Sequence, residues 1–129
     1  MIGAERVDFV CVPTRDLERA AAFYGETLGL ERNPNSSEPW IEFETGNLTI
    51  ALLPHEFMRT PEFRTNAGPI ALRVHDVHEA RRKLEETGVE FHMDTIDSGV
   101  CHIATFSDPD GNALMLHRRY APYADGSRP

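Results

Sequence analysis

Apolar and polar residues alternate along this chain in two segments that repeat each other. Residues 7–13 alternate as in a β-strand, and Asp16 then precedes apolar residues at helical spacing over 17–27. The same order returns in the second half, where a strand begins at Ile70 and Asp76 precedes a second helix. A repeat of this length predicts two similar supersecondary units.

Glycines and turn motifs set the limits of the other predicted elements. Gly29 ends the first helix, and Gly88 ends the second one, which covers 77–87. Gly46-Asn47 and Asp108-Pro109-Asp110-Gly111 each predict a hairpin turn. The remaining predicted elements are strands over 40–44, 48–53, 89–93, 100–106 and 112–117.

This pattern divides the chain into four parts. The first unit covers residues 1–53, and the second covers 70–118. The proline-containing segment 54–69 is a linker with room for one helical turn, and 119–129 is a coil-like tail.

Composition limits the classes of partner. The chain has 129 residues and a net charge of −8, and its 13 Lys and Arg residues form no dense run, so nucleic acid is not expected as a partner. No apolar stretch is long enough for a membrane span and no secretory leader is evident, so we expect a cytoplasmic protein without a membrane partner. Two cysteines are too few for a disulfide framework.

Three motifs together resemble those of a known superfamily. They are Arg15-Asp16-Leu17-Glu18-Arg19-Ala20-Ala21-Ala22-Phe23-Tyr24, Leu28-Gly29-Leu30 and Asp108-Pro109-Asp110-Gly111-Asn112. With the repeated order of strands and helix, they resemble the vicinal oxygen chelate superfamily, which includes glyoxalase I, extradiol dioxygenases, fosfomycin-resistance transferases and bleomycin-resistance proteins. The resemblance implies an α+β fold in which two tandem βαβββ modules form a curled mixed sheet around a cup. It also implies a homodimer.

Catalytic members of that superfamily bind a divalent metal through four strand positions. Laid on this sequence, these positions fall on Phe9, Pro69, Met115 and, less directly, Ala51. Phe, Pro and Ala carry no donor atom, and a lone thioether does not suit a hard metal. We therefore expect no metal cofactor at this place, and metal-dependent chemistry of the usual kind is not expected.

Strand alternation assigns side chains to two faces of the predicted sheets. Ile41, Phe43, Ile50, Leu52, Ile70, Leu72, Val74, Ile103, Leu114 and Leu116 form an apolar face expected under the helices. The other face, which would line the cup, supplies the candidate ligand-binding residues Phe9, Cys11, Trp40, Ala51 and Met115, joined by Phe57 from the linker. Aromatic residues at such positions also suit a core or a subunit interface.

Two polar pairs on the cup face are candidates for catalysis. A tight turn around Asp108 to Gly111 would place His102 directly opposite His117, where two imidazoles could transfer a proton, hold a relocated metal or simply be solvated. Glu42 and Arg73 either neutralise each other or act separately, with Arg73 on an anionic or carbonyl oxygen and Glu42 as base or cation ligand.

Two functions are consistent with these residues. The first is a metal-independent protein that binds a planar or cationic small organic ligand, such as a metabolite or an antibiotic, and sequesters it. The alternative is an enzyme of the same fold that uses His102, His117, Glu42 and Arg73 for acid–base chemistry, with no metal or a relocated one. A cup filled by the protein's own side chains, in an accessory protein, is a third interpretation.

Overall fold

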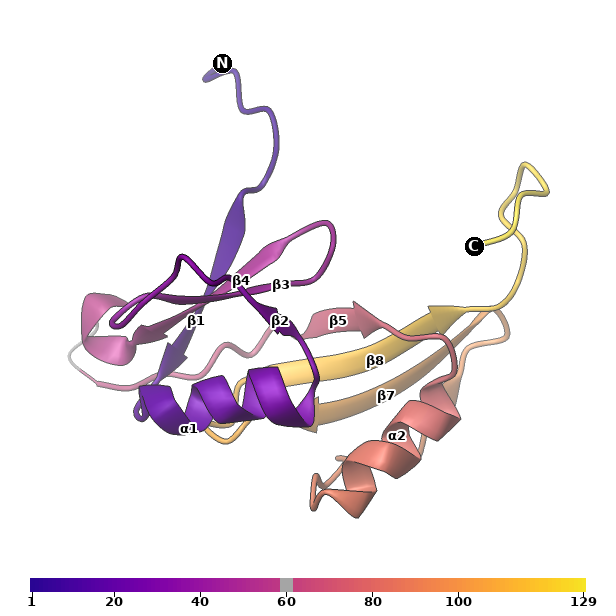
Figure 1. The fold of residues 1–129 in the computed structure, drawn as a ribbon. Coiled ribbons are helices and arrows are strands. Elements are labelled where there is room, and N and C mark those ends of the chain that lie inside the picture. Colours follow the sequence, from indigo (N-terminus) through magenta and orange to yellow (C-terminus); the bar gives the residue numbers. More distant parts are fainter. Residues whose placement is uncertain (59–61) are drawn as a thin grey trace. The chain divides into compact units, whose positions relative to one another are not determined.

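The computed structural model describes residues 1–58 and 62–129, and the chain forms two compact units (Figure 1). They are Met1–Thr65 and Asn66–Pro129, so that the division falls inside the segment expected to be a linker. Each unit is described by itself below. The cup expected between them stays a prediction.

The described part of the first unit contains a four-stranded sheet, a helical segment after its first strand and a short 3-10 helix at its end. Its elements are β1 (Phe9–Thr14), α1 (Leu17–Ala22), the π-helical η1 (Phe23–Thr27), β2 (Glu31–Arg32), β3 (Ile41–Glu44), β4 (Thr49–Pro54) and the 3-10 helix η2 (His55–Met58). The strand order is β1-β4-β3-β2, in which β1 runs parallel to β4 and the other neighbours are antiparallel.

Local sequence explains where the first helix begins and how it packs. The Asp16 carboxylate accepts a hydrogen bond from the Arg19 backbone N–H at 3.1 Å, as an N-cap does. Tyr24, fully buried, packs its ring 6.2 Å from that of Phe43. Gly25 allows this approach, because a Cβ there would lie 3.1 Å from the Phe43 ring.

The second unit repeats the same order. It consists of β5 (Ile70–Arg73), α2 (Val77–Glu86), β6 (Ile96–Asp97), β7 (Cys101–Ser107) and β8 (Ala113–Arg119), with strand order β5-β8-β7-β6. Asp76 is the N-cap of α2 and accepts from the Glu79 backbone N–H at 3.0 Å. Gly88 follows the helix with a φ of 95°, a left-handed conformation that suits glycine.

The α+β fold of two βαβββ units is therefore confirmed. The prediction of a strand at 89–93 was wrong, because only an isolated bridge between Phe91 and Phe106 forms there. The strand that pairs with β7 begins at Ile96 instead. The backbone N–H of Val89 still bonds to the carbonyl of Leu84 in α2 at 3.1 Å, so this segment first completes the end of the helix.

Each sheet buries one apolar side. In the first unit Ile41, Phe43, Ile50 and Leu52 are at most 2% exposed, and in the second Leu114 and Leu116 are equally buried. None of the helices in the described ranges has the length and apolar character needed to cross a membrane.

Candidate functional site

The side of the first sheet that faces away from α1 carries the strongest candidate site. We call it the first face, and its strand residues are Phe9, Cys11, Pro13, Glu31, Glu42, Glu44, Thr49, Ala51 and Leu53. The register places Cys11 beside Ala51 and Ala51 beside Glu42, in one row across three strands. These residues alternate with the buried apolar side chains, as the sequence predicted for this unit.

Two aromatic rings form the exposed part of the first face. The rings of Phe9 and Trp40 meet edge to face, with centroids 5.2 Å apart and an interplanar angle of 88°. Phe9 is 43% exposed and Trp40 is 36% exposed. Edge-to-face contact holds the two rings in place and leaves aromatic surface available for a planar ligand.

The carboxylate of Glu42 lies beside this ring pair. The Trp40 indole N–H donates to Oε1 of Glu42 at 2.8 Å, and the Asn33 amide donates to Oε2 at 2.9 Å. Both donors are neutral, and among the described residues of the first unit no Lys, Arg or His side chain forms an ion pair with Glu42. The site therefore holds a negative charge that is oriented but not neutralised.

The other candidates of the first unit differ in how far a ligand could reach them. Cys11 is half-buried, and burial raises the pKa of its thiol, which favours the neutral form over a nucleophilic thiolate. Ala51 is fully buried and offers no surface of its own. Phe57 is 61% exposed on η2. Glu42 and Arg73 belong to different units, so their expected pairing stays a prediction.

The second unit corrects the expected pairing of two histidines. His102 is opposite Arg118, and His117 is opposite Ile103, so His102 and His117 lie on opposite sides of the sheet. The reason is the length of the hairpin loop. Ser107 pairs with Ala113, which makes a loop of residues 108–112, one residue longer than the expected tight turn. A shift of one residue moves every side chain of one strand to the other face.

The same shift reverses the expected sides of two neighbouring residues. Ile103 lies away from α2, and Ala104 lies on the side that the helix covers.

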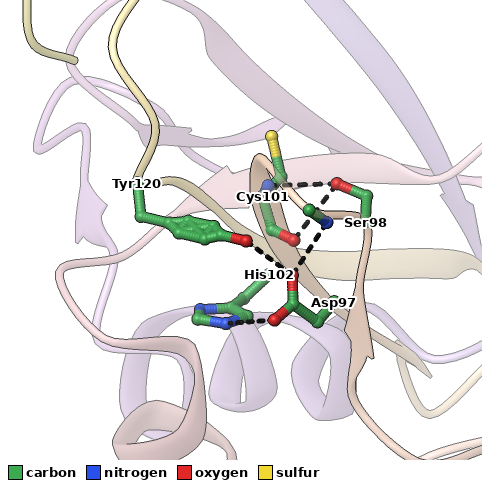
Figure 2. A network of polar contacts seen from close by, with 6 residues as sticks. Asp97, Ser98, Cys101, His102 and Tyr120 are labelled. Atoms are coloured by element: carbon green, nitrogen blue, oxygen red, sulfur yellow. Dashed lines mark hydrogen bonds and ion pairs between the residues drawn. The ribbon is translucent and has the colours of Figure 1, made fainter.

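His102 instead belongs to a polar network on the side of the sheet that α2 covers (Figure 2). Its ring stacks on Tyr120 with centroids 4.8 Å apart, and its other contact is an edge-to-face arrangement with His78 of α2 at 4.9 Å. The His102 Nε2 lies 3.5 Å from Asp97 Oδ2. The Tyr120 hydroxyl donates to Asp97 Oδ1 at 2.8 Å.

Hydrogen bonds to Asp97 set the electrostatics of that network. The Gly99 backbone N–H, followed by the Tyr120 hydroxyl and the nearby His102, holds the pKa of Asp97 below its ordinary value. The same Tyr120–Asp97 bond raises the pKa of the Tyr120 hydroxyl. This network ties the start of the tail to the sheet, and we assign it a structural role.

The remaining predicted residues lie on the opposite side of the second sheet. We call this side the second face, and its strand residues are Ala71, Arg73, Ile96, Cys101, Ile103, Thr105, Ser107, Ala113, Met115, His117 and Arg119. Met115 lies between Ala71 and Thr105, and His117 lies between Arg73 and Ile103.

Four residues important to these arrangements were not predicted from the sequence. Asn33, Asp97 and Tyr120 lie in a loop, in a two-residue strand and in the tail, where no periodicity identifies them. Arg119 could have been found, because it continues the spacing of Met115 and His117 along β8.

The positions at which the family resemblance implies metal ligands do not fit a divalent ion. Phe9 has no donor atom, and its ring is engaged with Trp40. Pro69 and Ala51 likewise offer no side-chain donor. In the described ranges no group of three or more His, Cys, Asp or Glu residues could hold a metal ion.

Comparisons with known proteins agree with this architecture. The model of the Glyoxalase/Bleomycin resistance protein/Dioxygenase superfamily matches residues 6–116. A solved structure of an antibiotic binding protein from a Streptomyces species has 25% identity and a TM-score of 0.75, and the match covers 92% of this chain and 99% of that one.

Two further structures extend the comparison. A member of the same superfamily from Sphaerobacter thermophilus has 27% identity and a TM-score of 0.71, with 88% of this chain and 97% of that chain covered. Lactoylglutathione lyase from Agrobacterium tumefaciens has 18% identity and a TM-score of 0.72, with 88% and 93% covered, a likeness in fold alone.

Proposed function

This chain belongs to the glyoxalase/bleomycin resistance protein/dioxygenase superfamily, and from that premise we propose that it binds and sequesters a small organic molecule without a metal at the usual position. The ligand is a metabolite or an antibiotic. The likeness to a Streptomyces protein whose name states that it binds an antibiotic supports this proposal.

One observation carries the proposal and indicates the class of ligand. The exposed rings of Phe9 and Trp40 lie beside a Glu42 carboxylate that only neutral donors contact. A planar group can stack on such rings, and a positive charge on it is attracted by both the carboxylate and the aromatic faces. We therefore propose a planar organic cation as the ligand of the first face.

A charge series on one ring skeleton tests this idea. The probes are 2-naphthamidine, 2-naphthamide and 2-naphthoate, which have similar shape but are cationic, neutral and anionic. Trp40 is the one tryptophan of the chain, so its indole N–H gives a single NMR signal in the labelled protein. We expect the amidine to shift this signal at the lowest concentration and the carboxylate at the highest.

A matched pair of variants separates the role of Glu42 from that of overall charge. Glu42→Gln is expected to weaken amidine binding roughly fivefold, because it removes a partly buried opposite charge. Glu90→Gln makes the same change in net charge at an exposed position and should leave binding unchanged. Equal affinity of the amidine and the amide, or equal effects of the two substitutions, would contradict the proposal.

The structure does not support the pair of neighbouring histidines on which the alternative, acid–base catalysis, was based. That alternative required His102 and His117 to act together, whereas the register puts them on opposite sides of the sheet. Glu42 is held by Trp40 and Asn33 rather than by a histidine. We therefore put forward binding alone.

The family resemblance also motivates the proposal of a cytoplasmic homodimer. Light scattering coupled to size-exclusion chromatography would measure the mass of the particle. A mass near twice 14.5 kDa is expected, and a monomer at all concentrations would contradict the dimer.

A further inference from the structure

Basic side chains gather on the second face, in a chain whose net charge is −8. The parallel register of β5 and β8 places Arg73 directly beside His117. Arg119 follows two residues further along β8, and side chains two residues apart on a strand point to the same side. Arg73, His117 and Arg119 thus place three basic residues on one side of this sheet.

Burial shows which side of the sheet these residues occupy. Leu114 and Leu116 are 1% and 2% exposed, and they alternate with the less buried Met115 and His117. In β5 the pattern is the same, since Ile70 and Leu72 are half-buried and Arg73 is exposed. Arg73 and His117 are therefore neighbours on the side away from the apolar layer.

Neither of these two side chains is engaged within the second unit. Among residues 66–129, the Arg73 guanidinium and the His117 ring make no hydrogen bond and no ion pair. The strand residues around them on the second face are Ile103, Met115, Thr105 and Ala71, and none is acidic. The carboxylate of β6, Asp97, pairs with His102 and so belongs to the other side.

Arg119 differs because the tail already holds it. Its Nη2 donates to the Pro122 carbonyl at 2.8 Å, and its guanidinium carbon lies 4.9 Å from the centre of the Tyr123 ring. Its Nε is buried and, within the described residues, makes no hydrogen bond. Arg119 thus lies on the same side of β8 as His117, but its guanidinium is held at the tail and is not counted in the proposed site.

We propose that Arg73 and His117 form a binding site for an oxyanion, a carboxylate or a phosphate, carried by a small molecule. The planar guanidinium has parallel N–H donors that match two oxygens of either group, and a ring N–H of His117 can donate to the same anion. This site goes beyond the cation site proposed for the first face, and it stands whether or not that site binds its ligand.

The test measures where anionic probes shift the amide signals of labelled protein. The probes are 2-naphthoate and 2-naphthyl phosphate, with 2-naphthamide as the neutral control. We expect both anions to shift the signals of residues 71–73 and 115–119, and the tighter of the two identifies the preferred oxyanion. The Trp40 indole signal reports on the first face separately, so failure of one proposal is distinguishable from failure of the other.

Variants then assign the binding to the two residues. Arg73→Gln and His117→Gln are each expected to weaken anion binding roughly fivefold, as the loss of one charge-assisted contact at a solvent-accessible site should. Arg82→Gln is the matched control, since Arg82 lies on α2 and pairs with Glu86. Unchanged affinity in Arg73→Gln and His117→Gln, equal loss in Arg82→Gln, or anion-induced shifts confined to other residues would overturn the proposal.

Discussion

The first and second faces occupy the same place in two copies of one topology, but they carry opposite charge. Val12 pairs with Leu52 in the first unit as Leu72 pairs with Leu116 in the second, so the two sheets can be compared row by row. The row Cys11–Ala51–Glu42 corresponds to Ala71–Met115–Thr105, and Pro13–Leu53 corresponds to Arg73–His117.

The comparison shows which side of each sheet is constrained by folding. The side under the helix is apolar in both units, because it forms the core. The side away from the helix has an acidic group held by neutral donors in one unit and unengaged basic groups in the other. The two units therefore share a fold but differ in the charged side chains on the side of the sheet away from the helix, because packing of the core does not determine those residues.

The largest effect on stability is expected when a phenylalanine on each side of the first sheet is replaced by alanine and the two variants are compared. Phe43 is 1% exposed and Phe9 is 43% exposed. Phe43→Ala should lower the free energy of unfolding by about 3–5 kcal/mol, as for other buried phenylalanines. Phe9→Ala should cost about 1 kcal/mol in stability but abolish the ring pair with Trp40. Urea denaturation measures both values, and equal losses would refute the division between a core side and a binding side.

The next largest effect is expected on ligand affinity when the charge of Glu42 on the first face is reversed. Glu42→Lys places a cation beside Trp40 and Phe9, so affinity for 2-naphthamidine should fall roughly thirtyfold while affinity for 2-naphthoate rises. Titrations followed by the Trp40 indole signal give both affinities. If the order of the three naphthyl probes did not change, the carboxylate would not determine the ligand preference of this face.

The corresponding reversal on the second face should be smaller, because Arg73 is exposed. Arg73→Glu is expected to weaken 2-naphthoate binding roughly tenfold, since solvent screens the added repulsion. Arg82→Glu provides the control on the opposite side of the same unit. Amide shifts of residues 115–119 measure the affinity, and a variant that still binds the anion normally would show that the second face is not its site.

How far the sequence predicted these faces depended on the two hairpin loops. In the first unit Glu44 pairs with Thr49, and the alternation of apolar residues predicted the burial of Ile41, Phe43, Ile50 and Leu52. It did not predict that Ala51, assigned to the other side of β4, is buried as well. In the second unit the same method assigned Arg73, Met115 and His117 correctly to one side of the sheet but put His102 there as well. The fold could be predicted because strand periodicity and helix caps are local signals.

The register of the second hairpin could not be predicted because it depends on Asn112. Asp108 Oδ1 accepts hydrogen bonds from the backbone of Asp110 and Asn112 at 2.9 Å each, and the Asn112 amide donates to Asp108 Oδ2 at 2.8 Å. The side-chain oxygen of Asn112 also accepts from the distant Asn66 backbone at 2.8 Å. These contacts keep Asn112 in the loop, and one of them is made by a segment 46 residues away, which no local pattern reveals.

The smallest predicted effect concerns the network of Asp97, His102 and Tyr120, which lies on the α2 side of the second sheet, opposite the second face. The Gly99 N–H, the Tyr120 hydroxyl and His102 lower the pKa of Asp97 from its ordinary value of 3.8. Ionised Asp97 therefore stabilises the folded state above pH 3.8, and this contribution disappears as the pH falls through the lowered pKa. Asp97→Asn should reduce the melting temperature at pH 5, and the difference from the unmodified chain should shrink towards pH 2.

Because the network lies on the α2 side, the same substitution should leave 2-naphthoate binding at Arg73 and His117 unchanged. A loss of anion affinity in Asp97→Asn would mean that the two sides of the second sheet are coupled, and that the second face depends on more than its own side chains.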